Sequence, residues 1–180
     1  MLKKFKLNIA QFLLNKKNKN TVRKVKAIGL DKAIEIGIIY DATNRMEYEA
    51  VKKLTNYLIE ERKKVATLGY INSKKGSELM SPHLHYRYFD NNNLSRLMIP
   101  KGNEVDKFIA TPFQILIDLT MSDCFPNKYI TTLSVSRFKV GSSGDYRDEA
   151  CDLTIALKEN KSIDQLILQI KHYLKMINAN

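Results

Sequence analysis

The stretch FQILIDLTM, residues 113–121, is almost continuously apolar. A strand of this composition is buried on both of its faces, and such strands occur in parallel sheets that helices cover on both sides. More than any other feature of the sequence, this stretch therefore favours an α/β fold built on a mostly parallel sheet. It also places Asp118 and Thr120 close to the carboxyl end of a central strand.

Strand-like and helix-like stretches alternate on either side of this central strand. The other expected strands are residues 32–42, 64–72, 85–90, 137–141 and 150–157. The expected helices are residues 47–63, 103–110, 126–136 and 162–178. We therefore predict one α/β domain over residues 28–180, a three-layer fold of the Rossmann-like or flavodoxin-like kind with a mostly parallel sheet of five to six strands. A strand order of 3-2-1-4-5 would make the first strand and residues 113–121 neighbours where the order reverses, which is where ligands bind in such sheets.

The positive charge of the chain is concentrated in its first 27 residues. The whole chain has a formal net charge of +11, from 30 Lys and Arg against 19 Asp and Glu. The segment contains no acid and nine of the positive residues: Lys3, Lys4, Lys6, Lys16, Lys17, Lys19, Arg23, Lys24 and Lys26. The rest of the chain is almost neutral, which argues against a nucleic-acid surface spread over the whole domain.

The same segment has the apolar periodicity of an α-helix. The residues that would share one helical face are Leu2, Phe5, Ile9, Phe12 and Leu13. The polar run NKKNKN, which begins at Asn15, indicates the end of the helix and a linker. Residues 1–27 are therefore expected to form a basic amphipathic helix and a linker in front of the α/β domain.

Three kinds of surface suit this segment. An anionic bilayer would take the apolar face into its interface while the lysines meet the headgroups. A protein partner, or the domain itself, would cover the apolar face and leave the lysines in solvent. RNA, on the ribosome or elsewhere, would bind the lysines through its phosphates. The sequence favours a non-catalytic α/β protein that docks through this helix onto a protein partner or an anionic membrane, with RNA as the alternative.

Candidates for a phosphate-ligand or nucleotide-binding enzyme lie at the expected strand ends. Asp41 and Asp118 could hold Mg²⁺ against a phosphate, and Lys139 on the next strand could complete a phosphoryl-acceptor arrangement. The loop GSSGD that follows could cradle an anion with backbone N–H groups of Gly141, Ser142, Ser143 and Gly144. The loop matches neither glycine-rich phosphate signature, and no second acid accompanies Asp41. An enzyme is therefore an alternative hypothesis, and we assign no catalytic residue.

Neither a metal nor a cofactor is expected from the sequence. The run HLH at residues 83–85 offers two imidazoles, whereas zinc needs at least a third ligand. Cys124 and Cys151 have no Cys-x-x-Cys partner, and two cysteines suit reduced thiols in the cytoplasm. No apolar run reaches the ~18 to 20 residues that span a bilayer. The expected location is cytoplasmic, with a peripheral position at the inner face of the membrane if the helix binds lipid.

Several motifs together carry a resemblance. The order of YDA, FQILIDL, a proline-led helix, SRFKVG, CDLTI and a final KHYLKMIN resembles a family of small uncharacterised bacterial proteins, a domain of unknown function. The resemblance covers most of residues 27–178 and implies that the body is one unit, with no activity attached. Within it, FQILIDL and RFKVG are also similar to one Rossmann-like half of heptosyltransferase-type sugar transferases, a local likeness that bears on fold rather than on activity.

Overall fold

The computed structural model describes residues 2–73, 84–157 and 161–177, and of Leu2 and Lys3 only the backbone. Within these ranges the helices are α1 (Leu2–Asn18), α2 (Arg45–Glu60), α3 (Asn103–Ala110), α4 (Phe125–Leu133), α5 (Arg147–Ala150) and α6 (Ile163–Met176), with a 3-10 turn η2 (Asn91–Asn93). The strands are β1 (Glu35–Asp41), β2 (Lys64–Ile71), β3 (Tyr86–Asp90), β4 (Ile115–Asp118), β5 (Phe138–Ser142) and β6 (Leu153–Ile155). Strands and helices therefore alternate along the chain as the sequence predicts.

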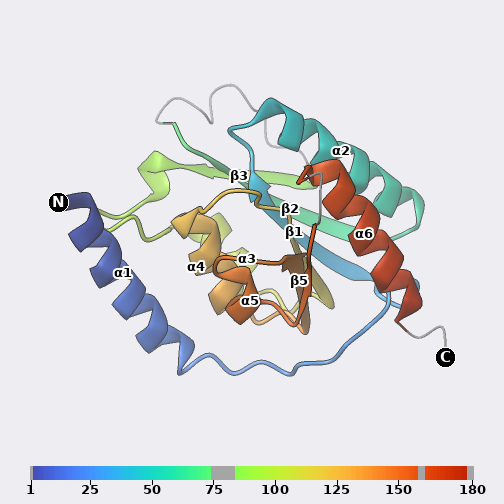
Figure 1. Ribbon diagram of the computed structural model, residues 1–180, viewed down its shortest axis with the longest axis horizontal. Helices are drawn as coiled ribbons and strands as arrows, with labels where there is room; N and C mark the ends of the chain where they lie inside the picture. The colour runs from blue at the N-terminus through green and yellow to red at the C-terminus, as the bar shows by residue number, and fades with distance from the viewer. Residues whose placement is uncertain (1, 74–83, 158–160, 178–180) are drawn as a thin grey trace.

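The strands of the described residues form one sheet in the order β3-β2-β1-β4-β5-β6, and every neighbouring pair is parallel. Helices α2 and α6 cover one face of this sheet, and α3, α4 and α5 lie on the other (Figure 1). The predicted three-layer α/β fold is confirmed, and the sheet is wholly parallel.

The strand order reverses between β1 and β4, the reversal that an order of 3-2-1-4-5 implies. Ile39 of β1 is paired with Leu68 of β2 on one side and with Asp118 of β4 on the other. Because all the strands are parallel, their carboxyl ends share one edge of the sheet, where Asp41 and Asp118 end the two central strands. A crevice at such a reversal is the usual ligand position in open α/β sheets.

The two central strands supply side chains to both cores. Ile36, Ile38 and Tyr40 of β1 pack with α2 and α6, whereas Ile39 packs into the cluster that includes α3 and α4. All four side chains have no exposed surface. This double burial explains why β1 and β4 are apolar without alternation.

The structure differs from the sequence-based prediction at several element ends. Strand β4 is only four residues long, shorter than the predicted run at 113–121. Its last backbone bond to β1 runs from the N–H of Leu119 to the carbonyl of Ile39 at 2.9 Å. The short helix α5 was not predicted. Helix α1 continues past Leu14 to Asn18, since Lys16 and Lys17 in its last turn stabilise the negative end of the helix dipole.

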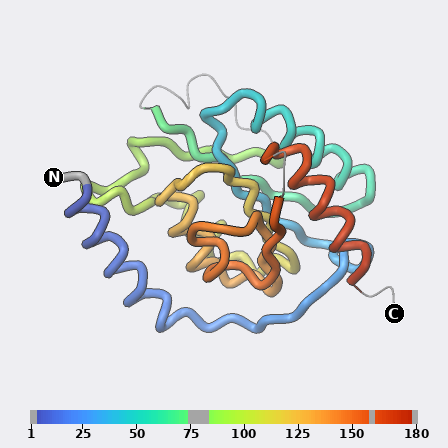
Figure 2. Tube along the Cα trace, in the orientation of Figure 1, coloured from blue at the N-terminus to red at the C-terminus, as the bar shows by residue number. Residues whose placement is uncertain are grey.

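Helix α1 lies outside the three layers, beside α4 (Figure 1). The chain then runs as an extended linker along the outside of the molecule to β1 (Figure 2). Two backbone bonds hold this linker to the body, from Lys26 N–H to the Arg137 carbonyl at 3.0 Å and from Leu30 N–H to the Leu174 carbonyl at 2.9 Å. The segment predicted as helix and linker therefore contacts the α/β domain in both parts: the helix packs beside α4, and the linker is held by backbone bonds.

Candidate functional site

Asp118 ends β4 at the strand reversal and is completely buried. Its Oδ1 accepts a hydrogen bond from the backbone N–H of Thr120 at 2.9 Å. Its Oδ2 accepts hydrogen bonds from the hydroxyls of Thr131 and Tyr146, each at 2.7 Å. Burial and the nearby Asp118 charge raise the pKa of Tyr146 well above its ordinary value, so this hydroxyl stays protonated and donates. The carboxylate is thus engaged inside the protein and offers nothing to a ligand.

Lys139 on β5 is also buried, with 2% of its surface exposed. Its Nζ donates to the backbone carbonyls of Thr131 and Thr132 at 2.7 and 3.0 Å, in the last turn of α4. Such carbonyls lack partners within their own helix, so the amine caps α4. Burial, with a smaller effect of the Arg23 charge, lowers the pKa of Lys139 to about 8. The proposed phosphoryl-acceptor arrangement therefore has two of its three groups, Asp118 and Lys139, committed to the fold.

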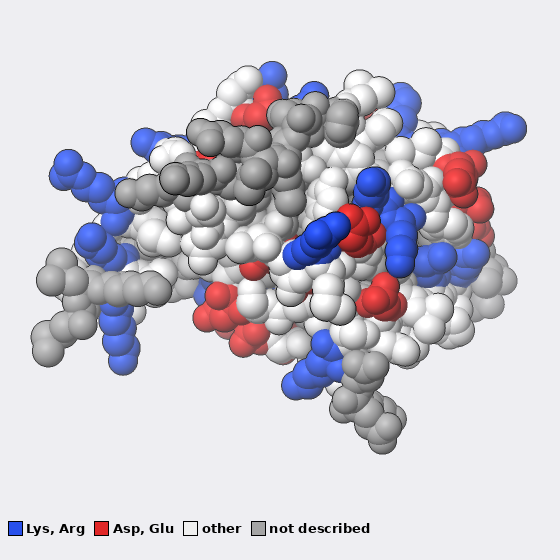
Figure 3. Space-filling view, turned by 90° about the horizontal axis from the view of Figure 1, so that it is seen from above, with Lys and Arg blue, Asp and Glu red and all other residues white. Residues whose placement is uncertain are grey.

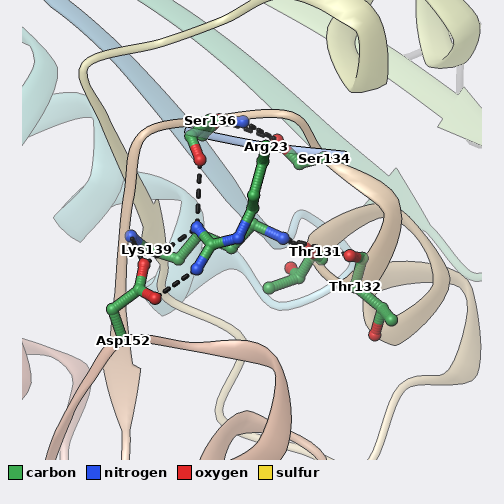
Figure 4. A network of polar contacts seen from close by, with 7 residues as sticks. All are labelled: Arg23, Thr131, Thr132, Ser134, Ser136, Lys139 and Asp152. Atoms are coloured by element: carbon green, nitrogen blue, oxygen red, sulfur yellow. Dashed lines mark hydrogen bonds and ion pairs between the residues drawn. The ribbon is translucent and has the colours of Figure 1, made fainter. Parts of the chain in front are cut away.

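Arg23 of the linker binds the body next to Lys139 (Figure 4). Its guanidinium donates to the Ser136 carbonyl at 3.0 Å and forms an ion pair with both carboxylate oxygens of Asp152. Asp152 also accepts the backbone N–H of Lys139 at 2.8 Å. Arg23 is one of the nine positive residues expected to meet an anionic surface, and in the structure this ion pair already occupies it.

The loop 141–145 uses its backbone donors internally. The N–H of Ser143 donates to the Ile155 carbonyl at 2.8 Å, and the N–H of Gly144 donates to an α5 carboxylate at 3.0 Å. Gly144 has φ of 102°, a left-handed conformation that glycine adopts without strain. A pocket of about 310 Å³ adjoins the loop and includes Ser142 in its lining. The two N–H groups of Ser143 and Gly144 are thus not free to cradle an anion.

Asp41 at the end of β1 has a second acid beside it that the sequence did not reveal. Its Oδ1 accepts the backbone N–H of Thr43 at 2.9 Å. Glu47, in the first turn of α2, is half-buried, and its Oε2 has no hydrogen-bond partner among the described residues. Burial and then the Asp41 charge raise the pKa of Glu47 to about 7. The sequence hid this acid because it falls within an ordinary amphipathic helix pattern.

A pocket of about 550 Å³ opens where the strand order reverses. The strand ends contribute Asp41, Tyr70 and Asn72 to its lining, and the segment that leads into α4 closes its other side. Helix α1 forms one wall through Leu7, Asn8 and Gln11. We call this cavity the switch-point pocket. Of the strand-end acids predicted as ligand-binding, only Asp41 lines it.

Helix α1 has two apolar faces, and the face expected from the sequence to dock is not the one that packs on α4. Ala10 and Leu14 are completely buried, and Leu14 clusters with Tyr129 and Leu133 of α4. On the opposite side of the helix, Phe5 is 66% exposed and Phe12 is 67% exposed. In the predicted face, Phe5 and Phe12 are therefore exposed and Ile9 and Leu13 are partly buried, whereas the side chain of Leu2 lies outside the described residues.

The lysines of α1 and the linker are mostly exposed. The exposed ones are Lys4, Lys16, Lys17, Lys19, Lys24 and Lys26, Lys6 is partly buried, and the side chain of Lys3 is not described. Lys17 donates to the hydroxyl of Tyr129 at 2.9 Å, which ties it to α4. At the end of the molecule where α1 begins, on the left of Figure 3, Lys and Arg stand out without acidic neighbours.

The described residues contain no group of three or more histidines, cysteines and acids that could hold a metal ion. His83 lies outside these residues, and Nδ1 of His85 is 3.1 Å from the Val65 carbonyl. Cys124 and Cys151 are free thiols, and burial raises the pKa of Cys124 to about 12, which makes it unreactive at neutral pH. No helix in the described ranges has the length and apolarity needed to cross a membrane.

Comparison with known proteins identifies a family and nothing beyond it. No curated protein and no solved structure matches the chain. The likeness to heptosyltransferase-type sugar transferases and the bacterial origin therefore remain predictions. A family model described as a family of unknown function, DUF6913, matches residues 6–177, which include most of α1 as well as the whole sheet. The predicted resemblance to a domain of unknown function is confirmed: the chain belongs to the family of unknown function DUF6913.

Proposed function

We propose that this protein is a non-catalytic α/β domain that binds an anionic membrane surface through the outer face of α1, which we define as Phe5, Ile9 and Phe12. The exposure of Phe5 and Phe12 carries this proposal, because the opposite face of the same helix already packs on α4. The two rings are seven residues apart, two helical turns, and so project on the same side. Exposed apolar surface of this kind, rimmed by polar residues, is typical of membrane and protein interfaces.

The charges around this face favour lipid headgroups. Lys4 and Lys16 are exposed on α1, Lys19 follows it, and no acid precedes Asp31 in the chain. A lysine near an anionic membrane contributes about 1 kcal/mol, and burial of a phenylalanine side chain contributes about 1.5–3 kcal/mol. Two rings and a few lysines therefore give reversible peripheral binding rather than permanent insertion. RNA phosphates would engage the lysines and leave both rings without a role.

Binding at the inner face of a membrane would place the α/β body in the cytoplasm. The free thiols of Cys124 and Cys151 suit that reducing compartment. The alternative of a phosphate-ligand enzyme has less support, since the bonds of Asp118 and Lys139 within the fold leave neither group available to a substrate.

Vesicle sedimentation of the full-length protein tests the proposal. We expect binding to vesicles of phosphatidylcholine with added phosphatidylserine and little binding to phosphatidylcholine alone. The double variant Phe5→Glu/Phe12→Glu removes the apolar burial and should lower the affinity by about a hundredfold or more. The matched control, Met46→Glu/Leu168→Glu, changes two residues that are 79% and 56% exposed on α2 and α6, and it should bind as the wild type does.

Equal loss of binding in both double variants would contradict a specific role for α1. Tight binding to RNA that survives the phenylalanine changes would overturn the proposal in favour of RNA, especially if affinity falls about 10³-fold between about 50 and 200 mM salt. The vesicle interaction should be less salt-sensitive, because salt does not screen apolar burial.

A further inference from the structure

The position and size of the switch-point pocket are those of a small-molecule site. Its volume of about 550 Å³ lies within the range of roughly 300–1,000 Å³ found for ligand pockets. It lies at the carboxyl ends of β1 and β2, beside the reversal of strand order between β1 and β4. Nothing in the proposed membrane contact uses it, since that contact involves the outer face of α1 and the pocket meets other residues of the helix.

The polar groups of this pocket suit hydroxyl groups on a ligand. The Asp41 carboxylate has one internal bond, at Oδ1, and the described residues give its Oδ2 no partner. The side-chain oxygen of Asn72 accepts the Nδ2 of Asn91 at 3.2 Å, which leaves the Asn72 amide nitrogen as a donor. A carboxylate only accepts hydrogen bonds and an amide nitrogen only donates them. A hydroxyl group can satisfy both.

The charge in the pocket disfavours phosphate. Two carboxylates, Asp41 and Asp123, line it against one lysine, Lys128. Burial and then nearby negative charges, including that of Asp41, raise the pKa of Tyr70 to about 12 and that of Cys124 to about 12. Burial is the largest cause of both shifts, so the two lining carboxylates themselves are what would repel a phosphate dianion and attract hydroxyl donors.

The apolar part of the lining is fixed in place. The ring of Tyr70 packs on Phe89 with ring centroids 5.0 Å apart, and its hydroxyl donates to Asn91 at 2.6 Å. Phe125 packs on Tyr129 with centroids 6.4 Å apart. The two aromatic side chains provide a flat apolar wall against which the ring of a ligand can lie. The neighbouring Asp41 carboxylate can accept hydrogen bonds from the hydroxyl groups of that ligand.

We propose that the switch-point pocket binds a small neutral ligand through a vicinal diol, the group shared by ribonucleosides and free sugars. The Asp41 carboxylate accepts hydrogen bonds from both hydroxyls, Asn72 donates to one of them, and the ring of the ligand lies against Tyr70 or Phe125. The site is a binding site and involves no bond-making step.

Calorimetric titration of the full-length protein tests this assignment with matched ligands. The probes are adenosine and uridine, their 2′-deoxy forms, their 5′-monophosphates, and methyl riboside. We expect a ribonucleoside or methyl riboside to bind. Binding of the ribonucleoside alone would identify the ligand class as nucleosides, and binding of methyl riboside would identify it as sugars. Loss of one hydroxyl in the deoxy form and addition of a phosphate should each weaken binding by about tenfold or more, since a hydrogen bond to a charged group contributes about 1.5–3 kcal/mol.

Two variants locate the site. Asp41→Asn keeps an oxygen for the Thr43 N–H and removes the charge, so it should weaken diol binding by about tenfold or more. Ser122→Trp, at an exposed position in the lining, should block the pocket without disturbing the core. The control Asp31→Asn removes an exposed acid before β1, at the other edge of the sheet, and should change nothing. Equal binding of deoxy and ribo forms, tighter binding of the monophosphates, or no binding at millimolar concentration would overturn the proposal.

Discussion

The two halves of the sheet, β1 with β2 on one side of the strand reversal and β4 with β5 on the other, hold polar side chains in different surroundings. In the β4 and β5 half, Asp118 at the carboxyl end of β4 and Lys139 near the amino end of β5 are both buried and bonded within the fold. Over β1 and β2, Asp41 and Asn72 border an open pocket. A strand-end acid is therefore a site candidate only when its oxygens remain free, and sequence alone does not distinguish the two cases.

The closed half is built by α4 and α5, which bring hydroxyl groups and carbonyls to the two charges. Thr131 contributes to both, with its hydroxyl to Asp118 and its carbonyl to Lys139. In the open half, α1 and the first turn of α4 line the pocket without filling it. Substitutions in the closed half should therefore act on stability, whereas those in the open half should act on binding.

Replacement of Asp118 should have the largest effect on stability. Asp118→Ala leaves the Thr120 N–H and the hydroxyls of Thr131 and Tyr146 buried without their acceptor. Each unsatisfied buried donor costs about 1–3 kcal/mol, so we expect a loss of about 3 kcal/mol or more in the free energy of unfolding. Urea unfolding, monitored by circular dichroism, measures it.

The matched control is Asp41→Ala, which removes the acid of the open half and one local turn bond. Its cost should stay below about 1 kcal/mol, as for most partly exposed positions. Similar losses in the two variants would show that the halves do not differ as their contacts suggest.

Lys139 sharpens the comparison through pH. Its folded-state pKa of about 8 lies below the ordinary value of 10.5, so between these values the unfolded chain holds a proton that the folded chain has lost. The free energy of unfolding should therefore rise with pH across this window, by about 3 kcal/mol at most from this group. Lys139→Met should remove that rise.

The difference between wild type and Lys139→Met is the quantity to measure. Buried tyrosines and cysteines whose pKa is raised, Tyr70 and Cys124 among them, act in the opposite direction above about pH 9 and are common to both proteins. Chemical denaturation from pH 7 to 10 gives the difference. A constant difference would mean that Lys139 titrates as an exposed lysine does.

The sequence predicted most of the fold because the fold depends on local apolar patterns. The doubly buried run at 113–121 identified the parallel sheet, and the alternation of strand-like and helix-like stretches around it identified the fold class. The same patterns could not give the partners of Asp118 or the proximity of Glu47 to Asp41, because those contacts join elements that are distant in the sequence or depend on where a helix begins. The open half of the edge was thus only partly predictable.

The first helix shows the same limit. Its spacing identified Phe5 and Phe12 as one apolar face, and the structure leaves that face exposed while burying Ala10 and Leu14. An alanine and one leucine give a weak apolar signal beside two phenylalanines, so a pattern ranked by hydrophobicity does not show which face packs on the body. Which face meets the body depends on the shape of α4, where Tyr129 and Leu133 receive Leu14.

Glu47 belongs to the open half and should have a smaller effect on stability. Its folded-state pKa of about 7 lies above the ordinary 4.5, so its contribution to stability is complete below about pH 4.5 and is lost as the pH rises through 7. Glu47→Gln should therefore stabilise the protein at neutral pH and not at pH 4, by about 1 kcal/mol once solvent screening of this half-buried group is allowed for. Thermal or urea unfolding at the two pH values tests it.

Asp41→Asn should have the smallest effect on stability and the clearest effect on this titration. Asn retains the acceptor for the Thr43 N–H, so the free energy of unfolding should change by less than about 0.5 kcal/mol. Loss of the Asp41 charge should lower the pKa of Glu47 only in part, since burial is the larger cause and remains. Carbon-13 NMR of the Glu47 carboxyl resolves this shift directly. An unchanged Glu47 titration would show that the two carboxylates do not interact. The carboxyl end of β1 would then have no electrostatic feature that sets it apart from the closed half.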